Sequence, residues 1–262
     1  MFSQIWDFMR TPSEDVKLPL LGSHWPILTI IGTYLLLVKV IGPKFMENRE
    51  PFDLRAVIKV YNKMQIVYNL LMFVFTIHFM FGPGNFDLRC IRNLPMDHEY
   101  KNWERILCYS YFVNKFIDML ETFFFILRKK DRQISFLHVF HHVYMMYIPF
   151  FYIHYIGYGG HGLFVVFWNM LVHSIMYIYY YQSSLNRNSK AVLWWKKYMT
   201  TIQLIQFVIV LLHSIYTLFQ PDCEIAKLSS VLCAIFAVVF LILFINFYIS
   251  TYILPKQKKR LE

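Results

Sequence analysis

The stretch from Leu228 to Leu254, LSSVLCAIFAVVFLILFINFYISTYIL, decides the fold class of this chain because it contains no charged residue. About 20 consecutive apolar residues are enough to cross the hydrocarbon core of a bilayer as an α-helix. Only helices and closed barrels satisfy their backbone polar groups in lipid, and barrel strands are shorter and alternate in polarity. The stretch therefore predicts a membrane-spanning helix.

Six further apolar runs precede this stretch, so the sequence predicts seven spans. These runs cover residues 25–43, 64–83, 106–127, 134–156, 163–181 and 198–219. The spans leave no room for a separate soluble domain. We therefore expect a single all-α membrane domain over residues 1–262, a polytopic bundle of seven transmembrane helices, with a basic tail at 255–262.

The composition agrees with a membrane protein and excludes several other classes. Of the 262 residues, 57% are hydrophobic and only 16% are charged, yet the net charge is +10. A nucleic-acid-binding domain would be much less apolar, so we expect no nucleic acid partner. A chain with 19% aromatic residues is not disordered. Four cysteines are too few for a disulfide scaffold.

The distribution of Lys and Arg predicts the orientation of the spans. Of the 26 basic residues, 17 lie in the segments that one side of the membrane would hold, and 7 lie in those of the other side. The basic side comprises residues 44–63, 128–133, 182–197 and 255–262. Cytosolic loops carry the excess of Lys and Arg, so we expect a cytosolic carboxyl terminus and a lumenal or external amino terminus.

The same topology places two cysteines, Cys90 and Cys223, in non-cytosolic loops. Disulfides form in the oxidising medium of the secretory pathway, so we expect a bridge between them. Two unpaired lumenal thiols are the alternative. The tail at 255–262 is like a dilysine retrieval signal of the endoplasmic reticulum, although an ordinary cytosolic cluster of positive charge would look the same.

Ionisable side chains inside predicted spans are costly and mark functional sites by default. The third span contains Lys115, Asp118, Glu121 and Thr122, at offsets that place them on one helix face. A structural ion pair between Lys115 and Asp118 is the alternative to a role in a site. The cluster therefore indicates either a functional site or an ion pair that stabilises helix packing.

The fourth span contains an H-x-x-H-H box made of His138, His141 and His142. A single histidine in a span is more often a packed, hydrogen-bonded group than a catalyst. Three imidazoles on one side of a helix within a turn and a half favour a catalytic role over a structural one.

Further polar residues follow in the next two spans. Hydrogen bonds between helices and an interfacial aromatic belt are their ordinary structural roles. A basic loop between spans three and four sets topology, and it could also contact an anionic ligand. The residues concerned are Asn169, His173, Tyr177 and Tyr180 in span five, Gln203 and Gln206 in span six, and Arg128, Lys129 and Lys130 in the loop.

These motifs, in this order, resemble the signature boxes of the very-long-chain fatty acid elongases. H-x-x-H-H alone is not specific, but the full set is. The first box of that family usually reads K-x-x-E-x-x-D-T, whereas here Asp118 and Glu121 are interchanged. The boxes of this chain read KFIDMLET at 115–122, HVFHH at 138–142, NMLVH at 169–173 and QLIQ at 203–206.

The resemblance implies a 3-ketoacyl-CoA synthase of the endoplasmic reticulum membrane. Such an enzyme condenses a long-chain or very-long-chain acyl-CoA with malonyl-CoA and releases carbon dioxide and CoA, without a metal or prosthetic group. The resemblance also supports the Cys90–Cys223 bridge. Besides the two CoA substrates and membrane lipid, the expected partners are other enzymes of the elongation cycle or a second copy of the chain.

The residues themselves suggest the mechanism. No cysteine lies in the polar cluster, so we expect His141 to take the acyl group from the thioester, while His138 and His142 orient it or move protons. Stabilisers of the developing negative charge are expected at Asn169, His173 and Gln206. Direct condensation without an acyl-histidine is the alternative. Substrate contacts are expected from Lys115, Asp118, Glu121, Thr122, Arg128, Lys129, Lys130, Tyr177, Tyr180, Gln203 and Gln206.

Three other functions are less consistent with the sequence. A membrane desaturase or hydroxylase needs more histidine boxes to hold its irons, since imidazole is the ligand. A seven-helix receptor has no need of a histidine triplet beside a lysine and two acids. A transporter would be indicated by broken spans or internal repeats, and neither is evident.

Overall fold

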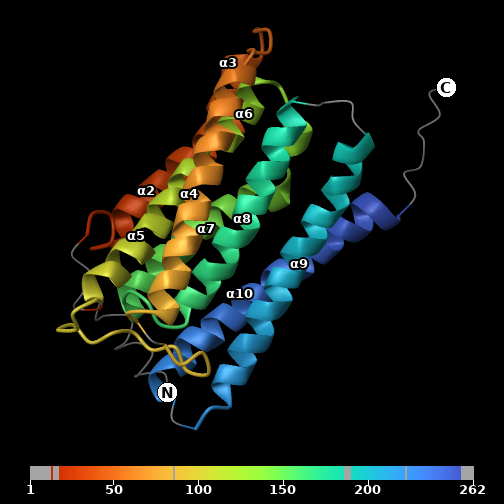
Figure 1. Ribbon diagram of the computed structural model, residues 1–262. Coiled ribbons are helices and arrows are strands. Elements are labelled where there is room, and N and C mark those ends of the chain that lie inside the picture. Colours follow the sequence, from red (N-terminus) through yellow and green to blue (C-terminus); the bar gives the residue numbers. More distant parts are fainter. Residues whose placement is uncertain (1–12, 14–17, 85, 186–189, 222, 255–262) are drawn as a thin grey trace.

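The structure is a computed structural model that describes residues 13, 18–84, 86–185, 190–221 and 223–254, and their regular structure is entirely helical (Figure 1). The predicted basic tail at 255–262 lies outside these residues. The elements are α2 (His24–Leu36), the π-helical η1 (Leu37–Ile41), α3 (Gly42–Met46), α4 (Arg55–Phe81), α5 (Lys101–Asp118), α6 (Leu120–Leu127), the 3-10 turn η2 (Asp131–Gln133), α7 (Phe136–Ile156), α8 (Gly162–Leu185), α9 (Lys190–Leu218), α10 (Glu224–Tyr248) and the π-helical η3 (Ile249–Ile253).

Five helical segments are long and apolar enough to cross a membrane. The first combines α2, η1 and α3, the second is α4, the third is α8, the fourth is most of α9, and the fifth runs from within α10 through η3. Their bounds are His24–Met46, Arg55–Phe81, Gly162–Leu185, Trp195–Leu218 and Lys227–Ile253. Their length and composition agree with a multi-pass membrane protein.

The two other predicted spans, 106–127 and 134–156, do not reach this standard. The first is divided between α5 and α6, and α5 contains five charged residues. The second, α7, is long enough but contains four histidines. Length and composition therefore support five of the seven predicted spans, because the two remaining segments hold the polar residues.

The predicted third span is interrupted at Met119, where α5 ends and α6 begins. The N–H of Met119 donates to the carbonyl of Phe116 at 3.2 Å, and the N–H of Thr122 donates to that of Met119 at 3.0 Å. These bonds reach back three residues instead of four and tighten the turn. As a result, the first box does not form one continuous helical face.

The start of α7 determines where its histidines lie. The Ser135 hydroxyl caps the helix by accepting the N–H of His138 at 3.2 Å, a common use of serine at an N-cap. His138 therefore lies in the first turn, at the end of the bundle that also holds α3 and α6. Further along, Pro149 removes one backbone donor within the helix and faces a cavity described below.

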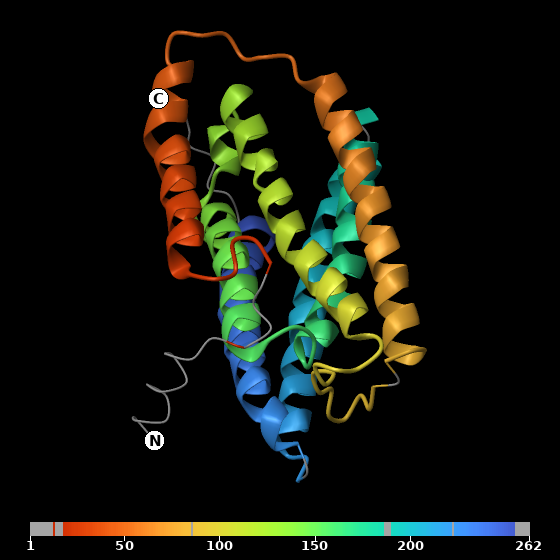
Figure 2. The same ribbon diagram turned by 90° about the vertical axis from the view of Figure 1, so that its left-hand side faces the viewer.

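The helices pack mainly as pairs. α4 runs along α8, α9 runs along α10 as a hairpin, and α8 also contacts α9. Figure 2 shows α7 between α2 and α5, and it contacts both helices. The helix that carries the histidine box thus lies among the other helices.

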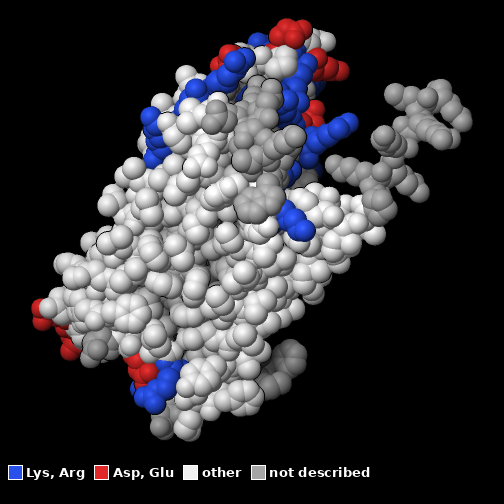
Figure 3. Space-filling model, turned by 45° about the vertical axis from the view of Figure 1, so that its right-hand side comes forward, with Lys and Arg blue, Asp and Glu red and all other residues white. Residues whose placement is uncertain are grey.

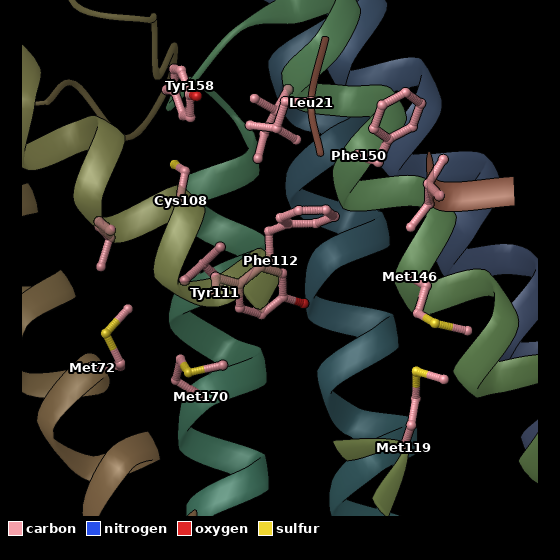
Figure 4. Close-up of a cluster of buried hydrophobic side chains, with 14 of the residues drawn as sticks. Leu21, Met72, Cys108, Tyr111, Phe112, Met119, Met146, Phe150, Tyr158 and Met170 are labelled. Atoms are coloured by element: carbon pink, nitrogen blue, oxygen red, sulfur yellow. The ribbon is translucent and has the colours of Figure 1, made fainter. Parts of the chain in front are cut away.

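The largest apolar core joins α2, α5, α7 and α8 (Figure 4). Its fully buried members include Phe112 on α5, Phe150 on α7 and Met170 on α8, and Leu21 reaches it from the segment before α2. In a membrane, van der Waals packing of such side chains holds the helices together. This core holds the helices that carry the polar residues of the site.

The two ends of the molecule differ in charge. Lys and Arg gather at the end that holds α3 and α6, here called the basic end (Figure 3). At the opposite end a disulfide joins Cys90 and Cys223, the two cysteines paired in the sequence analysis, with their Cα atoms 5.7 Å apart. It links the segment between α4 and α5 to the start of α10, and we call this the disulfide end.

Candidate functional site

A buried ion pair on α5 lies at the centre of the candidate site. The Lys115 ammonium donates to Asp118 Oδ2 at 3.1 Å and to Asn169 Oδ1 at 3.0 Å, across to α8. The Tyr111 hydroxyl also donates to Asn169 Oδ1, at 3.2 Å. All four side chains are buried. Since the Asn169 oxygen accepts both bonds, its Nδ2 group is left as a donor.

The other oxygen of Asp118 accepts two hydrogen bonds. Gln65 Nε2 on α4 donates to Oδ1 at 2.7 Å, and the Tyr177 hydroxyl on α8 donates at 2.9 Å. His173 Nδ1 lies 3.9 Å from Asp118 Oδ2 and has no hydrogen-bond partner among the described residues. The carboxylate therefore connects α4, α5 and α8.

Thr122 and two histidines form a second group on the other side of the helix break. Thr122 Oγ1 lies 2.8 Å from His138 Nε2 and 2.9 Å from the Tyr34 hydroxyl of α2. The rings of His138 and His142 meet edge to face with their centres 4.4 Å apart. His138 is thus held by hydrogen bonding and ring packing.

His141 differs from its neighbours in the box. Its ring contacts those of His142 and Phe240, with centres 5.4 Å and 5.5 Å away, but it has no hydrogen bond to any described residue. It faces α10 and lines both cavities described below. Its ring nitrogens are therefore available to a ligand.

The first cavity, here called the apolar cavity, lies among α7, α8, α9 and α10, with α5 at one end. It has a volume of about 130 Å³. Its walls are mostly aliphatic and aromatic, and its polar wall residues gather toward the basic end, where they include Asn169, His173, Gln203 and Gln206. At the disulfide end its lining includes Cys108, Tyr152 and Gly159.

The second cavity, here called the polar cavity, lies toward the basic end and has a volume of about 320 Å³. All three box histidines line it, together with Asp118 and Glu121. Glu121 Oε1 is buried and has no hydrogen-bond partner among the described residues. The two cavities share His141, His173, Gln203 and Phe244 in their linings, so they meet at these side chains.

The structure brings most of the predicted site residues to these two cavities. Lys115 and Thr122 support the site from behind through hydrogen bonds. The three basic residues of the predicted contact loop do not line either cavity in the described part of the chain. The residues that line at least one cavity are His138, His141, His142, Asn169, His173, Asp118, Glu121, Tyr177, Tyr180, Gln203 and Gln206, whereas Arg128, Lys129 and Lys130 line neither.

Two basic residues that the sequence analysis did not select line the polar cavity instead. They are Arg132, at the end of the same loop, and Lys196, near the start of α9. Lys129 donates to the carbonyl of Glu47 at 3.3 Å, which ties its loop to the end of α3. The position of a basic residue in the fold, rather than its charge alone, therefore decides whether it lines the cavity.

The sequence analysis also missed the polar face of α4. Gln65 donates to Asp118, the Tyr61 hydroxyl lies 3.2 Å from that of Tyr177, and Asn69 donates to the Gln65 carbonyl at 2.7 Å. These residues recur every four positions, which places them on one helix face. Their spacing could have revealed them, but the predicted span began at residue 64 and left out Tyr61, whereas α4 begins at Arg55.

The arrangement can hold a molecule that has a long apolar part and a polar head. The apolar part fits the apolar cavity, and the head then lies among imidazoles at the junction. Among the described residues there is no group of three or more His, Cys, Asp or Glu side chains placed to hold a metal ion. The chemistry of these side chains is nucleophilic and acid–base.

Comparison with known proteins gives a consistent result. Residues 19–260 match the model of the ELO: GNS1/SUR4 family. The chain is 47% identical over 226 residues to "Very long chain fatty acid elongase F" of Drosophila simulans, which covers 84% of each chain. It is 48% identical over 220 residues to the protein of the same name in Drosophila melanogaster, covering 84% of this chain and 85% of the relative. A third relative, "Very long chain fatty acid elongase 7" of Drosophila melanogaster, is 38% identical over 86% of this chain and 68% of its own length. With a match over nearly its whole length, the chain belongs to the ELO (GNS1/SUR4) family.

Proposed function

We propose that this chain is the condensing enzyme of fatty acid elongation, a 3-oxoacyl-CoA synthase that adds two carbons from malonyl-CoA to a long-chain acyl-CoA. The observation that carries the proposal is the position of His141, at the junction between an apolar and a polar cavity. The names of the relatives, all very long chain fatty acid elongases, support the same reaction class.

The two cavities match the two parts of an acyl-CoA. The acyl chain lies in the apolar cavity, and the CoA portion extends through the polar cavity toward the basic end. Arg132 and Lys196 line that cavity and supply positive charge for the phosphates. We therefore assign phosphate contact to these two residues in place of Arg128, Lys129 and Lys130.

The first step is acyl transfer to His141. One of its ring nitrogens attacks the thioester carbonyl, the carbon–sulfur bond breaks, and CoA leaves as its thiol after it takes the ring proton. An acyl-imidazole results, and it remains reactive. The absence of a hydrogen bond from His141 to any described residue leaves its lone pair available for this attack.

The second step forms the carbon–carbon bond. Malonyl-CoA loses carbon dioxide, and the resulting enolate carbon attacks the acyl carbonyl of His141. The bond to the imidazole then breaks, a ring nitrogen of His141 regains a proton from solvent, and 3-ketoacyl-CoA is released. Asn169 Nδ2 is directed as a donor because its oxygen accepts bonds from Lys115 and Tyr111. A donor fixed in advance stabilises the negative charge that develops on oxygen.

The membrane arrangement that we propose has seven crossing segments. The five apolar segments face lipid, while α5 with α6 and α7 cross within their shelter and place polar residues in the interior. The excess of Lys and Arg then puts the basic end in the cytosol, with the carboxyl terminus, and the amino terminus in the lumen. The oxidising lumen agrees with the Cys90–Cys223 bridge, and we propose the endoplasmic reticulum as the membrane.

The test uses purified protein in detergent or lipid, a panel of acyl-CoAs and malonyl-CoA, with 3-ketoacyl-CoA measured by mass spectrometry. Wild-type protein should form the product, and His141→Ala should not. Lys129→Ala serves as the control, because Lys129 is exposed and lines neither cavity. Absence of product from wild type with every acyl-CoA would overturn the proposal. So would a His141→Ala variant as active as wild type.

A second measurement separates the covalent route from direct condensation. Incubation with acyl-CoA alone should release CoA and leave an acyl group on His141, which peptide mass spectrometry detects. If neither is found while condensation proceeds, direct condensation replaces the acyl-histidine scheme. Metal analysis of the active protein checks the prediction that no metal is required, since stoichiometric iron would revive the hydroxylase interpretation.

A further inference from the structure

Three tyrosines line the apolar cavity, and they differ in what their hydroxyl groups bind. The Tyr111 hydroxyl donates to Asn169 Oδ1 at 3.2 Å, and the Tyr152 hydroxyl donates to the carbonyl of Gly159 at 3.2 Å. The hydroxyl of Tyr144 on α7 makes no hydrogen bond with any residue that the structure describes. A tyrosine hydroxyl that is removed from water usually has a partner. The Tyr144 hydroxyl is therefore available to a ligand in the cavity.

The packing of α10 holds the Tyr144 ring in the cavity wall. Phe236 and Phe240 meet this ring edge to face, with ring centres 5.2 Å and 5.1 Å away and interplanar angles of 90° and 89°. Both phenylalanines also line the cavity. Edge-to-face contact is favourable for aromatic pairs, so the hydroxyl is held at a fixed depth.

A second polar side chain of the apolar cavity also lacks a partner. Gln206 on α9 is only 4% exposed, yet its amide makes no hydrogen bond within the described part of the chain. Gln203, one turn earlier, donates to Met176 Sδ at 3.8 Å. A buried amide that is covered only by hydrocarbon loses its bonds to water and gains none in return, which is unfavourable. Gln206 is therefore best satisfied by a ligand that brings a polar group to it.

Tyr144 and Gln206 lie at the same depth in the cavity. His141 and Gln203 line both cavities and so mark the junction. Tyr144 and Gln206 each follow one of them by three residues, and they line the apolar cavity alone. α7 begins at the basic end, and α9 also runs from there toward the disulfide end (Figure 1). Three residues of helix rise about 4.5 Å. We call these two side chains the polar pair.

The depth of the polar pair determines which part of an acyl chain it meets. An extended chain advances about 1.2 Å per bond, a third of the length of an extended residue. A rise of about 4.5 Å therefore corresponds to about four bonds from the carbonyl carbon held at His141. Methylene groups at this position would leave both polar side chains without a partner.

We propose that the polar pair recognises a hydrogen-bond acceptor in the acyl chain, about four bonds from the thioester carbonyl. This inference rests on the proposed condensing function and narrows its substrate class to long-chain acyl-CoAs that carry such a group. The acceptor is an oxygen substituent or the π electrons of a double bond, which accept weaker hydrogen bonds. The Tyr144 hydroxyl and the Gln206 amide donate to it.

The test moves the acceptor along the chain. In each reaction, purified protein receives malonyl-CoA and equal amounts of a saturated acyl-CoA and of one acyl-CoA of the same length with a single cis double bond. A second series replaces the double bond by a keto oxygen, so the two series distinguish the sources of the acceptor. The product ratio, measured by mass spectrometry, should be highest when the group lies about four bonds from the carbonyl.

Two variants remove the polar pair with little change of shape. Tyr144→Phe removes only the hydroxyl and should lower the preference at that position about fivefold, since one hydrogen bond contributes about 1 kcal/mol. Gln206→Leu should act similarly, whereas a role of Gln206 in the reaction alone would slow all acyl chains equally and leave the ratios unchanged. Tyr147→Phe is the matched control on the same helix and should keep the wild-type profile. The Tyr147 hydroxyl lies 3.3 Å from His24 Nδ1, and Tyr147 lines neither cavity.

A maximum that Tyr144→Phe or Gln206→Leu reduces supports the inference, and the series that shows it identifies the acceptor. A flat profile in both series, or a maximum that both variants leave unchanged, would overturn the inference even though condensation proceeds. The ratio does not depend on how much protein is folded, and if one variant fails to fold, the other still decides. A wild-type protein that forms no product even from saturated acyl-CoAs would overturn the proposed function instead, so the two failures are distinguishable.

Discussion

Two buried ion pairs on α5 share the same spacing and the same burial but have different surroundings. Lys101 donates to Glu104 at 2.6 Å, and Lys115 donates to Asp118 at 3.1 Å, each pair three residues apart. Lys101 and Glu104 bind the backbone of Leu94, through its carbonyl at 2.9 Å and its N–H at 3.2 Å. That pair fastens the loop before α5 to the disulfide end.

The Lys115–Asp118 pair instead binds side chains from other helices and stands behind the cavity junction. Asn169, Gln65 and Tyr177 are its partners, and each comes from α4 or α8. Backbone partners hold a fold, whereas side-chain partners beside a cavity can direct a donor at a ligand. The same spacing of a lysine and an acid thus anchors a loop at one end of α5 and lies behind the cavity junction at the other.

The largest expected effect on condensation comes from replacing the Lys115–Asp118 pair by apolar residues. Such a replacement often leaves stability unchanged, because it removes both charges and their desolvation cost together. Lys115→Met with Asp118→Leu should stay folded but lose condensation by about 10³-fold, since Asn169 and His173 lose their support. Product formation per folded protein, with folding followed by size-exclusion chromatography, measures this.

The matched control is Lys101→Met with Glu104→Leu, which should keep condensation within a few-fold of wild type. Equal losses of activity in the two double variants would contradict a special role of the Lys115–Asp118 pair and would indicate that both pairs act only on stability. The single variant Glu104→Gln tests the structural role of the Lys101–Glu104 pair, because it leaves Lys101 buried without its charge partner. It should lower the unfolding temperature more than the double variant does.

A smaller effect is expected at Asn169, the side chain that Lys115 holds. Asn169→Leu removes the donor and should lower kcat by about 10²-fold, the range seen for a lost oxyanion donor. Leu94→Ala is the counterpart at the other pair, since it keeps the backbone carbonyl that Lys101 uses. If kcat falls equally in both variants, Asn169 does not act on the reaction.

The smallest effect is expected at Gln65, which acts on the reaction only through Asp118. Gln65→Leu removes a bond to a charged group and should lower kcat by about 10-fold with little change in KM. Thr76→Val is a suitable control on the same helix, because the one bond that its hydroxyl makes within the described part of the chain is to the carbonyl of Met72, one turn away. A rise in KM with unchanged kcat would place Gln65 in substrate binding instead.

The fold could be predicted in class but not in detail from the sequence. Apolar runs identified all five segments that are both long and apolar enough to span a membrane, because hydropathy is a local property of the sequence. The break at Met119 was not predicted, because no glycine or proline marks it. The start of α4 at Arg55 was also missed, because Arg55, Lys59 and Lys63 lower the hydropathy of its first turns.

The site was predictable where chemistry is unusual for a membrane. Histidines, amides and charged groups within apolar runs pointed to the residues that line the cavities. The residues that support the cavity lining from behind were not predictable in this way. Gln65 and Tyr61 on α4 look like ordinary polar helix residues until the packing of α4 against α8 brings them to Asp118 and Tyr177.

The sequence by itself determined that the chain is helical, apolar and basic at one end, and that it carries the motifs of its family, because composition and spacing are properties of the chain alone. Which of the two equally spaced ion pairs lies beside the cavities followed from the packing of the helices. Only the tertiary structure decided that Arg132 and Lys196, rather than Lys129, line the polar cavity. Those distinctions depend on which helices meet, and contacts between distant segments are set by packing rather than by local pattern.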